Sequence, residues 1–208
     1  MTTKSELRTS LKAQRRALAP RARVLAANEV ARLISATHWL APGKRIGLYA
    51  SMPQELGTTP LIELARARGC RIYLPRILSQ RAQRMAFLPI DAPGSSRGDL
   101  HALGMHEPGG TAFFPARFLD TIFVPSVALD HRGARLGHGA GYYDRALGFR
   151  RIRHHWRGPR LVGLAYSFQV VPEVPVTPHD VFMDVLVTDK GIYESLADEN
   201  RTLHVRYR

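Results

Sequence analysis

Cysteine is almost absent from this sequence: Cys70 is the only one among 208 residues. A single thiol excludes a disulfide framework within the chain and a zinc site built from several cysteines. The first residues lack the apolar core of a secretory signal peptide, and no apolar run is long enough to span a bilayer. We therefore expect a protein of the reducing cytoplasm without a membrane segment.

Acidic residues are scarce as well, with 17 Asp and Glu against 30 Lys and Arg, which gives a net charge of +13. This balance favours anionic partners such as nucleotides, polycarboxylates, nucleic acids or membrane surfaces, although an arginine-rich proteome produces the same bias. Hydrophobic residues make up 45% of the chain and charged residues 23%, which excludes wholesale disorder. The length favours a single domain spanning residues 1–208.

Two common nucleotide-binding motifs are missing. No G-x-x-x-x-G-K-[ST] run exists, and Gly137, Gly139 and Gly141 form G-x-G-x-G instead of the dinucleotide fingerprint. Residues 94–98 match the G-x-S-x-G elbow of hydrolases, but Pro93 stands where that motif requires a strand, so we regard the match as chance.

Apolar periodicity predicts alternating helices and strands. Two helices are expected within residues 4–36, and Pro20 suits the start of the second. Thr59 and Gly69 are placed to begin and end a third helix. In the first helix, the predicted apolar face holds Leu7, Leu11, Ala17 and Leu18, while Arg8, Lys12, Arg15 and Arg16 lie elsewhere. The expected strands are 45–50, 71–75, 85–88, 121–129, 161–166 and 184–188.

This alternation predicts an α/β fold of three layers, with a mainly parallel central sheet and helices on both faces. Residues 91–118 are rich in glycine and proline and are expected to form a functional loop, and residues 195–208 a mobile polar tail. Ligands of such sheets bind at the carboxyl ends of the strands. The strand predicted at 121–129 ends shortly before the most glycine-rich stretch of the chain, which is where we place the site.

The run from Gly133 to Arg145 reads G-A-R-L-G-H-G-A-G-Y-Y-D-R and is the most informative stretch. Glycine lets the backbone approach a ligand closely, and loop amides beside the start of a helix predicted to reach about residue 155 form an anion site. Arg135 and Arg145 add positive charge, and Asp144 offers a carboxylate to a metal ion. The pattern predicts a nucleotide-phosphate site, since a purely structural turn would not need these charges.

A second signal is Pro178-His179-Asp180, which precedes the last predicted strand. Asp180 is expected to join Asp144 around one Mg²⁺, because that ion takes few carboxylates besides phosphate and water oxygens. Taken alone, Asp180 would be an ordinary turn residue.

Two further signals depend on context. Lys4 and Arg8 lie four residues apart, so they share a helix face from which they can reach a phosphate, although alone they would indicate a solvated basic face. Glu55 follows a predicted strand and can accept N–H bonds from a heterocycle, unless residues 51–55 form an ordinary loop. The basic run 150–160 can attract nucleic acid, but it holds one aromatic residue and no known module, which favours a solvated face or a lure for a small anion.

Together these residues resemble the 5-formyltetrahydrofolate cyclo-ligase (methenyltetrahydrofolate synthetase) family over almost the whole chain. The resemblance implies ATP-dependent closure of 5-formyltetrahydrofolate to 5,10-methenyltetrahydrofolate with release of ADP and phosphate, through a phosphorylated formyl intermediate. ATP and Mg²⁺ are the implied cofactors. Leu103 departs from the family, which often has an aromatic residue near that position. The resemblance rests on Lys4-x-x-x-Arg8, Ser51-Met52-x-x-Glu55, His106-Glu107-Pro108, the motif from Pro125 to Arg145, Gln169 and His179-Asp180-x-x-x-Asp184.

The resemblance also implies roles for single residues. Lys4 and Arg135 are the expected catalytic residues, and Asp144 and Asp180 the expected metal ligands. The implied ATP site comprises Lys4, Arg8, Arg135, Leu136, Gly137, His138, Gly139, Ala140, Gly141, Tyr142 and Tyr143. The implied folate site comprises Ala50, Glu55, His138, Gly139, Ala140, Gly141 and Tyr142.

We expect a monomer whose partners are a reduced folate and ATP, without nucleic acid or membrane. Two alternatives stay open. One is a basic RNA-binding protein on the same fold. The other is an ATP-dependent ligase of a different small anion, for which the motif at 135–145 would look the same.

Overall fold

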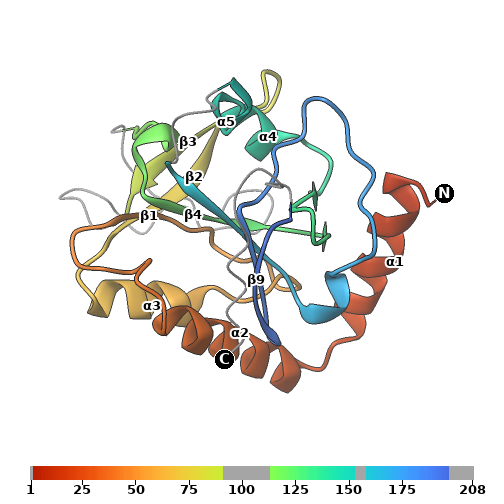
Figure 1. The fold of residues 1–208 in the computed structure, drawn as a ribbon, viewed down its shortest axis with the longest axis horizontal. Helices are drawn as coiled ribbons and strands as arrows, with labels where there is room; N and C mark the ends of the chain where they lie inside the picture. The colour runs from red at the N-terminus through yellow and green to blue at the C-terminus, as the bar shows by residue number, and fades with distance from the viewer. Residues whose placement is uncertain (1, 91–112, 153–157, 197–208) are drawn as a thin grey trace.

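The computed structural model describes residues 2–90, 113–152 and 158–196. A seven-stranded sheet runs in the order β3-β2-β1-β4-β7-β8-β9 (Figure 1). The five inner strands are parallel, and β3 and β9 pair antiparallel at the two edges. A separate two-stranded sheet joins β5 and β6. The strands are β1 (Arg45–Gly47), β2 (Arg71–Ser79), β3 (Arg84–Pro89), β4 (Thr121–Pro125), β5 (Ala128–Leu129), β6 (Arg135–Leu136), β7 (Arg160–Leu164), β8 (Val185–Thr188) and β9 (Gly191–Glu194).

Helices cover both faces of the large sheet, so the predicted three-layer α/β fold is confirmed. Figure 1 shows α2 and α3 on one side and α4 and α5 on the other, with α1 at one end. No helix among the described residues is long and apolar enough to cross a membrane. The helices are α1 (Lys4–Ala17), α2 (Pro20–Ser35), α3 (Thr59–Ala67), α4 (Tyr142–Ala146) and α5 (Phe149–Ile152), with 3-10 turns η1 (Ala116–Phe118) and η2 (Ser167–Gln169).

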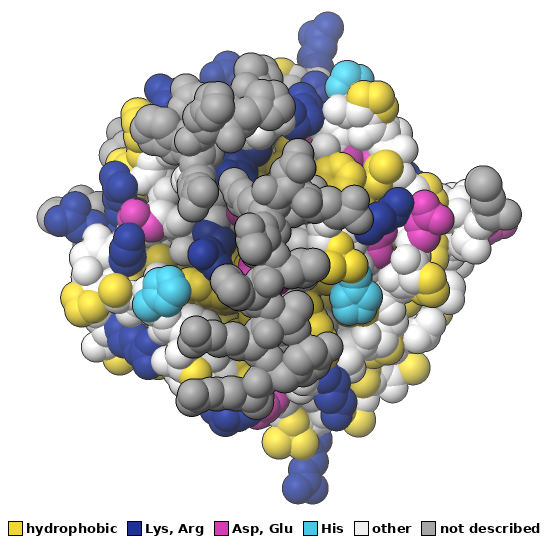
Figure 2. All heavy atoms as spheres, viewed as in Figure 1, with side chains coloured by type: hydrophobic (Ala, Val, Ile, Leu, Met, Phe, Trp, Pro, Cys, Tyr) yellow, Lys and Arg dark blue, Asp and Glu magenta, His cyan; other side chains and the backbone are white. Residues whose placement is uncertain are grey.

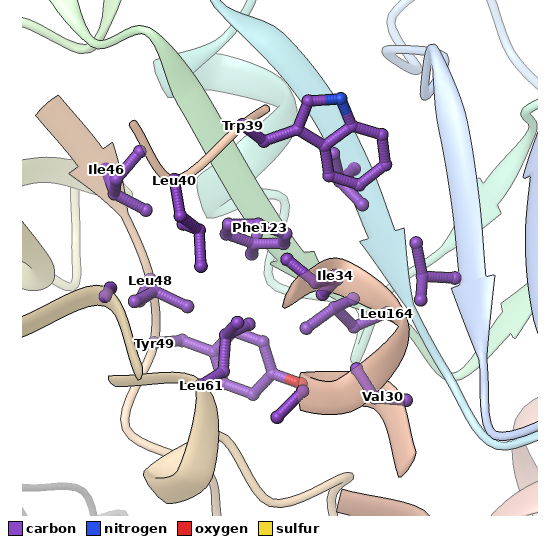
Figure 3. Packing of buried hydrophobic residues seen from close by; sticks show 14 of the residues in the cluster. Val30, Ile34, Trp39, Leu40, Ile46, Leu48, Tyr49, Leu61, Phe123 and Leu164 are labelled. Atoms are coloured by element: carbon purple, nitrogen blue, oxygen red, sulfur yellow. The ribbon is translucent and has the colours of Figure 1, made fainter. Parts of the chain in front are cut away.

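The core has one hydrophobic cluster on each face of the sheet. Successive residues of a strand point to opposite faces, so β4 gives Phe123 to the α2 and α3 side and Ile122 and Val124 to the other. On the first side Phe123 packs with Ile34 and Trp39 (Figure 3). Each such buried side chain stabilises the fold by about 1.5–3 kcal/mol.

The order of the strands creates a switch point at the centre of the sheet. The chain leaves β1 through α3 to reach β2 on one side, then returns by way of β3 to β4 on the other side of β1. Segments that leave the carboxyl ends of β1 and β4 therefore diverge, and a crevice at such a point is where ligands bind in open α/β sheets. Residues 48–58 and the glycine-rich stretch follow these two ends, as the sequence predicts.

The strand predicted at 121–129 is wrong as one element, because the chain leaves the sheet after Pro125. The Gln169 amide Nε2 donates to the carbonyls of Ser126 at 3.0 Å and Val127 at 2.6 Å, in place of a neighbouring strand. Gln169 is 1% exposed, and its Oε1 accepts from the Tyr166 amide at 3.0 Å. This buried side-chain amide therefore bonds the backbone of the two residues that lie between the end of β4 and the start of β5.

The single helix predicted to reach about residue 155 is also wrong, since α4 ends at Ala146 and α5 begins at Phe149. The Leu147 amide closes α4 on the carbonyls of Tyr143 and Arg145, and the poor helix former Gly148 follows. Residues 153–155 of that prediction lie outside the described residues.

The N-terminus of α3 and two short strands differ from expectation in smaller ways. Thr58, not Thr59, is the N-cap of α3, and its side chain makes no capping bond. Its Oγ1 instead donates to the Tyr49 carbonyl at 2.5 Å. Gly69 has the expected positive φ of 71°. The sequence did not predict β6 and β9. Residues 91–112 of the predicted loop and 197–208 of the predicted tail lie outside the described residues.

The predicted apolar face of α1 is only partly right. Leu11 is 4% exposed, but Ala17 is exposed and Arg15, placed away from that face, is 3% exposed. Lys4, Arg8, Leu11 and Arg15 recur at helical spacing and form the stripe that α1 turns toward the rest of the molecule. Leu7 packs with Leu11 against one core cluster, and Leu18 packs against another, so the inward face of α1 combines apolar and basic side chains.

Candidate functional site

We define the glycine loop as residues 137–141. A tight turn around Asp130 precedes it in the chain and sets its position. The buried Asp130 carboxylate accepts bonds from the amides of Arg132 at 3.0 Å, Ala134 at 3.1 Å and Val174 at 2.9 Å. Gly133 has a φ of 83°, and a Cβ there would lie 2.3 Å from the Met183 carbonyl oxygen. The turn therefore requires glycine. Sequence reasoning gave Asp130 no role, although the Asp-x-x-Gly spacing is a turn signal.

Arg135 is a buried guanidinium at the base of this loop, with its side chain 4% exposed. Its Nη2 donates to Asp144 Oδ2 at 3.0 Å and its Nη1 to the Pro125 carbonyl at 3.3 Å. The guanidinium also lies 5.6 Å from the centre of the Tyr143 ring. A Cβ on Gly137 would be 2.7 Å from Arg135 Nη1, so a larger residue there would displace the guanidinium.

Two donors in the site are buried without a partner among the described residues: Arg135 Nε and the Tyr143 hydroxyl. Burial raises the pKa of the Tyr143 phenol well above its ordinary range, so the hydroxyl stays protonated and can donate. An unmet buried donor costs about 1–3 kcal/mol, which a ligand oxygen would relieve. Such donors beside a glycine loop suit an anionic group.

The N-terminal helix reaches the same place. Lys4 Nζ lies 2.7 Å from Asp180 Oδ2, and Arg8 Nε donates to the Gly137 carbonyl at 2.9 Å. Burial raises the pKa of the Asp180 carboxyl, but Lys4 and the Thr177 amide outweigh it and hold the pKa below its usual value. Lys4 and Arg8 are therefore site-facing and not part of a solvated basic face.

The two aspartates predicted to hold Mg²⁺ lie in adjoining positions. Asp144 Oδ1 accepts from the amide of Val181, the neighbour of Asp180, at 3.2 Å. Each carboxylate is paired with a cation, Asp144 with Arg135 and Asp180 with Lys4. Within residues 2–90, 113–152 and 158–196 no group of three His, Cys, Asp or Glu could hold a metal ion. Two carboxylates fit Mg²⁺ when phosphate and water oxygens complete the shell.

Glu55 joins the segment after β1 to the glycine loop. Its side chain is 5% exposed, and Oε1 lies 2.9 Å from His138 Nε2. Oε2 accepts from the Met52 amide at 3.0 Å. Ala50, also predicted to contact the substrate, is half-buried at the start of this segment. The structure thus brings the two predicted substrate segments together, through a contact between Glu55 and His138 that the sequence does not reveal.

The positions of the remaining predicted residues say less about a ligand. The Leu136 side chain lies in a core cluster with Leu11 and Val127, so any ligand contact it makes is through its backbone. Tyr142 is half-buried, whereas Ala140 is exposed. Gly139 and Gly141 both have positive φ. Four calls lie outside the described residues: the match at 94–98, Leu103, the His106–Pro108 motif, and residues 153–157 of the basic run.

The chain is similar to proteins of one family. Residues 1–189 match the 5-formyltetrahydrofolate cyclo-ligase family. The 5-formyltetrahydrofolate cyclo-ligase of Escherichia coli (strain K12) is 31% identical over 186 residues, which cover 88% of this chain and 99% of that protein. The cyclo-ligase of Mycolicibacterium smegmatis is 31% identical over 193 residues, covering 90% and 94%. The NMR structure of Aquifex aeolicus 5,10-methenyltetrahydrofolate synthetase superposes with a TM-score of 0.77 at 29% identity, over 98% of this chain and 97% of that one.

Proposed function

The chain belongs to the 5-formyltetrahydrofolate cyclo-ligase family and is therefore a ligase, and we propose that it uses ATP to close 5-formyltetrahydrofolate to 5,10-methenyltetrahydrofolate. One observation carries the proposal. Lys4, Arg8 and Arg135 converge on the glycine loop, where two buried donors have no partner in the part of the chain that the structure describes. Cations and unmet donors around a glycine-rich backbone suit the binding of a triphosphate.

The reaction needs activation because the formyl group on N5 is an amide. Its oxygen attacks the γ-phosphorus of ATP, the bond to the bridging oxygen breaks, and ADP leaves. The carbon then carries a phosphate and has iminium character. N10 attacks that carbon and loses its proton, and the C–O bond breaks to release phosphate. The products are the methenyl cation, ADP and phosphate.

The protein contributes alignment and charge neutralisation more than covalent chemistry. Arg135 and Lys4 neutralise the phosphoryl group during transfer, and the loop amides with the Tyr143 hydroxyl donate to its oxygens. No side chain is needed as a covalent nucleophile. Holding the formyl oxygen in line with the γ-phosphorus can supply about 7–11 kcal/mol of the barrier reduction.

Asp144 and Asp180 are the residues that would hold Mg²⁺. Bound there, the ion would offset the negative charge of the phosphates. The chain's own cations already balance these carboxylates, since Arg135 pairs with Asp144 and Lys4 with Asp180. The site is therefore close to neutral before the nucleotide binds, and the same cations stand next to the incoming phosphates.

We assign the pterin to the Glu55 side of the crevice. A buried carboxylate is suited to accept from the N–H groups of a pterin ring. His138 occupies Oε1 of Glu55 at 2.9 Å in the free protein, so the pterin has to displace or share that contact. His138 would thus connect the folate side to the glycine loop.

Family membership favours this ligase over the RNA-binding alternative. On the face shown in Figure 2, Lys and Arg side chains of the described residues are spread around the surface and do not form one patch. A cytoplasmic location and a monomeric state stay predictions. An ATP-dependent ligase of another small anion would carry the same phosphate site, so the product has to be identified.

The direct test is the absorbance of the methenyl product, followed with and without ATP from 5-formyltetrahydrofolate. We expect product only when ATP is present, with one ADP released per product. Lys4→Gln should lower the rate, whereas Lys12→Gln, a change on the same helix outside the site, should not. An inactive wild-type protein that is folded and saturated with both substrates would overturn the proposal.

A further inference from the structure

The backbone that carries Glu55 is held in an unusual way. Four consecutive carbonyls, those of residues 53–56, each accept a hydrogen bond from a side chain that another part of the fold supplies. We call the four donors the carbonyl clamp. They are Arg23 Nη1 to Pro53 at 2.7 Å, Arg15 Nε to Gln54 at 2.8 Å, the Tyr166 hydroxyl to Glu55 at 3.0 Å and the Tyr49 hydroxyl to Leu56 at 3.2 Å.

The donors come from four separate elements. Arg15 belongs to α1 and Arg23 to α2, while Tyr49 follows β1 and Tyr166 follows β7. Arg23 also ties the end of α1, because its guanidinium donates to the carbonyls of Arg15, Arg16 and Leu18. Loops are usually more mobile than the elements they connect, so hydrogen bonds to four consecutive carbonyls restrain this loop.

Arg15 is the most costly member of the clamp. It is 3% exposed, and arginine is almost never buried this far unless it is paired. Burial lowers the pKa of its guanidinium, and the negative charge of Glu55 opposes that shift. An apolar side chain would fill the same space without the desolvation cost. An apolar side chain could not bond to the Gln54 carbonyl, and that bond is what Arg15 supplies from its buried position.

Tyr166 is the member of the clamp that contacts Glu55 directly, because its hydroxyl donates to the backbone carbonyl of Glu55. The residue is 2% exposed, and its ring stacks on Phe168 with centres 5.6 Å apart. Burial raises the pKa of the phenol, so the hydroxyl remains a donor at physiological pH. The packing of its ring helps to hold the hydroxyl at the Glu55 carbonyl.

We propose that the carbonyl clamp holds the Glu55 carboxylate in place for the pterin, and that Arg15 and Tyr166 are positioning residues for folate binding. This inference rests on the proposed function. The clamp acts only through the backbone of residues 53–56, on the folate side, while Lys4 and Arg8 serve the phosphate side from the same helix. A rigid loop avoids the entropy cost of ordering Glu55 when the substrate binds.

Tyr166→Phe is the cleanest test, because it removes one oxygen and keeps the ring. We expect the KM for 5-formyltetrahydrofolate to rise about fivefold, the effect of one buried hydrogen bond. The KM for ATP and kcat should stay within about twofold of wild type. Titration with 5-formyltetrahydrofolate in the absence of ATP should show the same loss of affinity. Tyr193→Phe, a change on the edge strand β9, is the matched control and should alter neither constant.

Arg15→Lys gives a second measurement with its own control. Lysine keeps the positive charge but loses the planar fork that reaches the Gln54 carbonyl. We expect the KM for the folate to rise about three- to tenfold, whereas Arg16→Lys, on the exposed side of the same helix, should behave as wild type. Circular dichroism establishes that each variant is folded before kinetics are measured.

The possible results distinguish a failure of the clamp proposal from a failure of the proposed ligase activity. If Tyr166→Phe and Arg15→Lys lower the melting temperature but leave the folate KM unchanged, the clamp is structural only and the inference is overturned. If both substrates' KM values rise together, the clamp does not act on Glu55 specifically, and the inference also fails. A wild-type protein that neither forms the methenyl product nor binds 5-formyltetrahydrofolate would overturn the proposed function first.

Discussion

Replacing Asp144 by alanine should destabilise the protein as well as impair its chemistry. Asp144 faces Arg135, whose side chain is 4% exposed, across a 3.0 Å ion pair. The substitution leaves that guanidinium with the Pro125 carbonyl at 3.3 Å and the Tyr143 ring as its remaining contacts. It also deprives the Val181 amide of its acceptor.

The magnitude follows from the burial of the two partners. Removing one member of a buried ion pair costs about 3–5 kcal/mol. The Asp144 side chain is 21% exposed, so water can partly replace it, and we expect about 3 kcal/mol, the lower end of that range. A domain of this size has about 5–15 kcal/mol in total, so the variant should remain folded at room temperature. Its melting temperature should fall by about 6–12 °C.

Urea unfolding of wild type, Asp144→Ala and Asp144→Asn measures this effect. Asparagine keeps an oxygen for Arg135 and should lose only about 1 kcal/mol. Both variants should lose ATP-dependent turnover, although only the alanine variant is strongly destabilised. An Asp144→Ala protein whose unfolding free energy lies within about 0.5 kcal/mol of wild type would refute the reasoning, because surface substitutions produce changes of that size.

Three further predictions concern other parts of the molecule. Gly163→Ala should cost about 1–3 kcal/mol in urea unfolding, because a Cβ would lie 2.8 Å from Leu129 Cδ2; an unchanged midpoint would contradict the packing. Burial raises the pKa of Asp120, but bonds from Arg45 outweigh it and leave the pKa lowered, so its stabilising contribution is present above about pH 4 and is lost below. The stability difference between wild type and Asp120→Asn should therefore shrink between pH 6 and pH 3, and a constant difference would argue against it. Arg135→Lys should raise the KM for ATP at least about tenfold, with equal KM values telling against the assigned role.

Elements defined by local patterns were predictable from the sequence. The spacing of apolar residues and the proline at position 20 placed α1 and α2 within a residue or two of their ends. The glycine-rich stretch predicted a loop with a closely packed backbone after a strand. The alternation of elements sufficed for a parallel sheet with its site at the carboxyl ends, because that relation follows from geometry common to all such sheets.

Elements set by distant contacts were not predictable. Gln169 ends a strand 44 residues earlier in the chain than itself, counted from Pro125, and nothing near Pro125 signals the break. Arg15 was expected away from the apolar face because periodicity weighs side chains by type, whereas its actual surroundings come from the loop at residues 53–56. The pair of Glu55 and His138 spans 83 residues. Such contacts exist only once the sheet has formed.

The position of α1 has a consequence for how the molecule assembles and comes apart. Lys4 meets Asp180, a partner 176 residues away along the chain, and contacts of such separation are slow to form because long loops have to close first. Only two of its 14 residues, Leu11 and Arg15, are buried, which places the helix at the low end of local stability. We therefore expect mild heating or denaturant to release this helix first, while the sheet stays folded. Because Lys4 and Arg8 leave the site with the helix, enzymatic activity should be lost at a lower temperature than the fold.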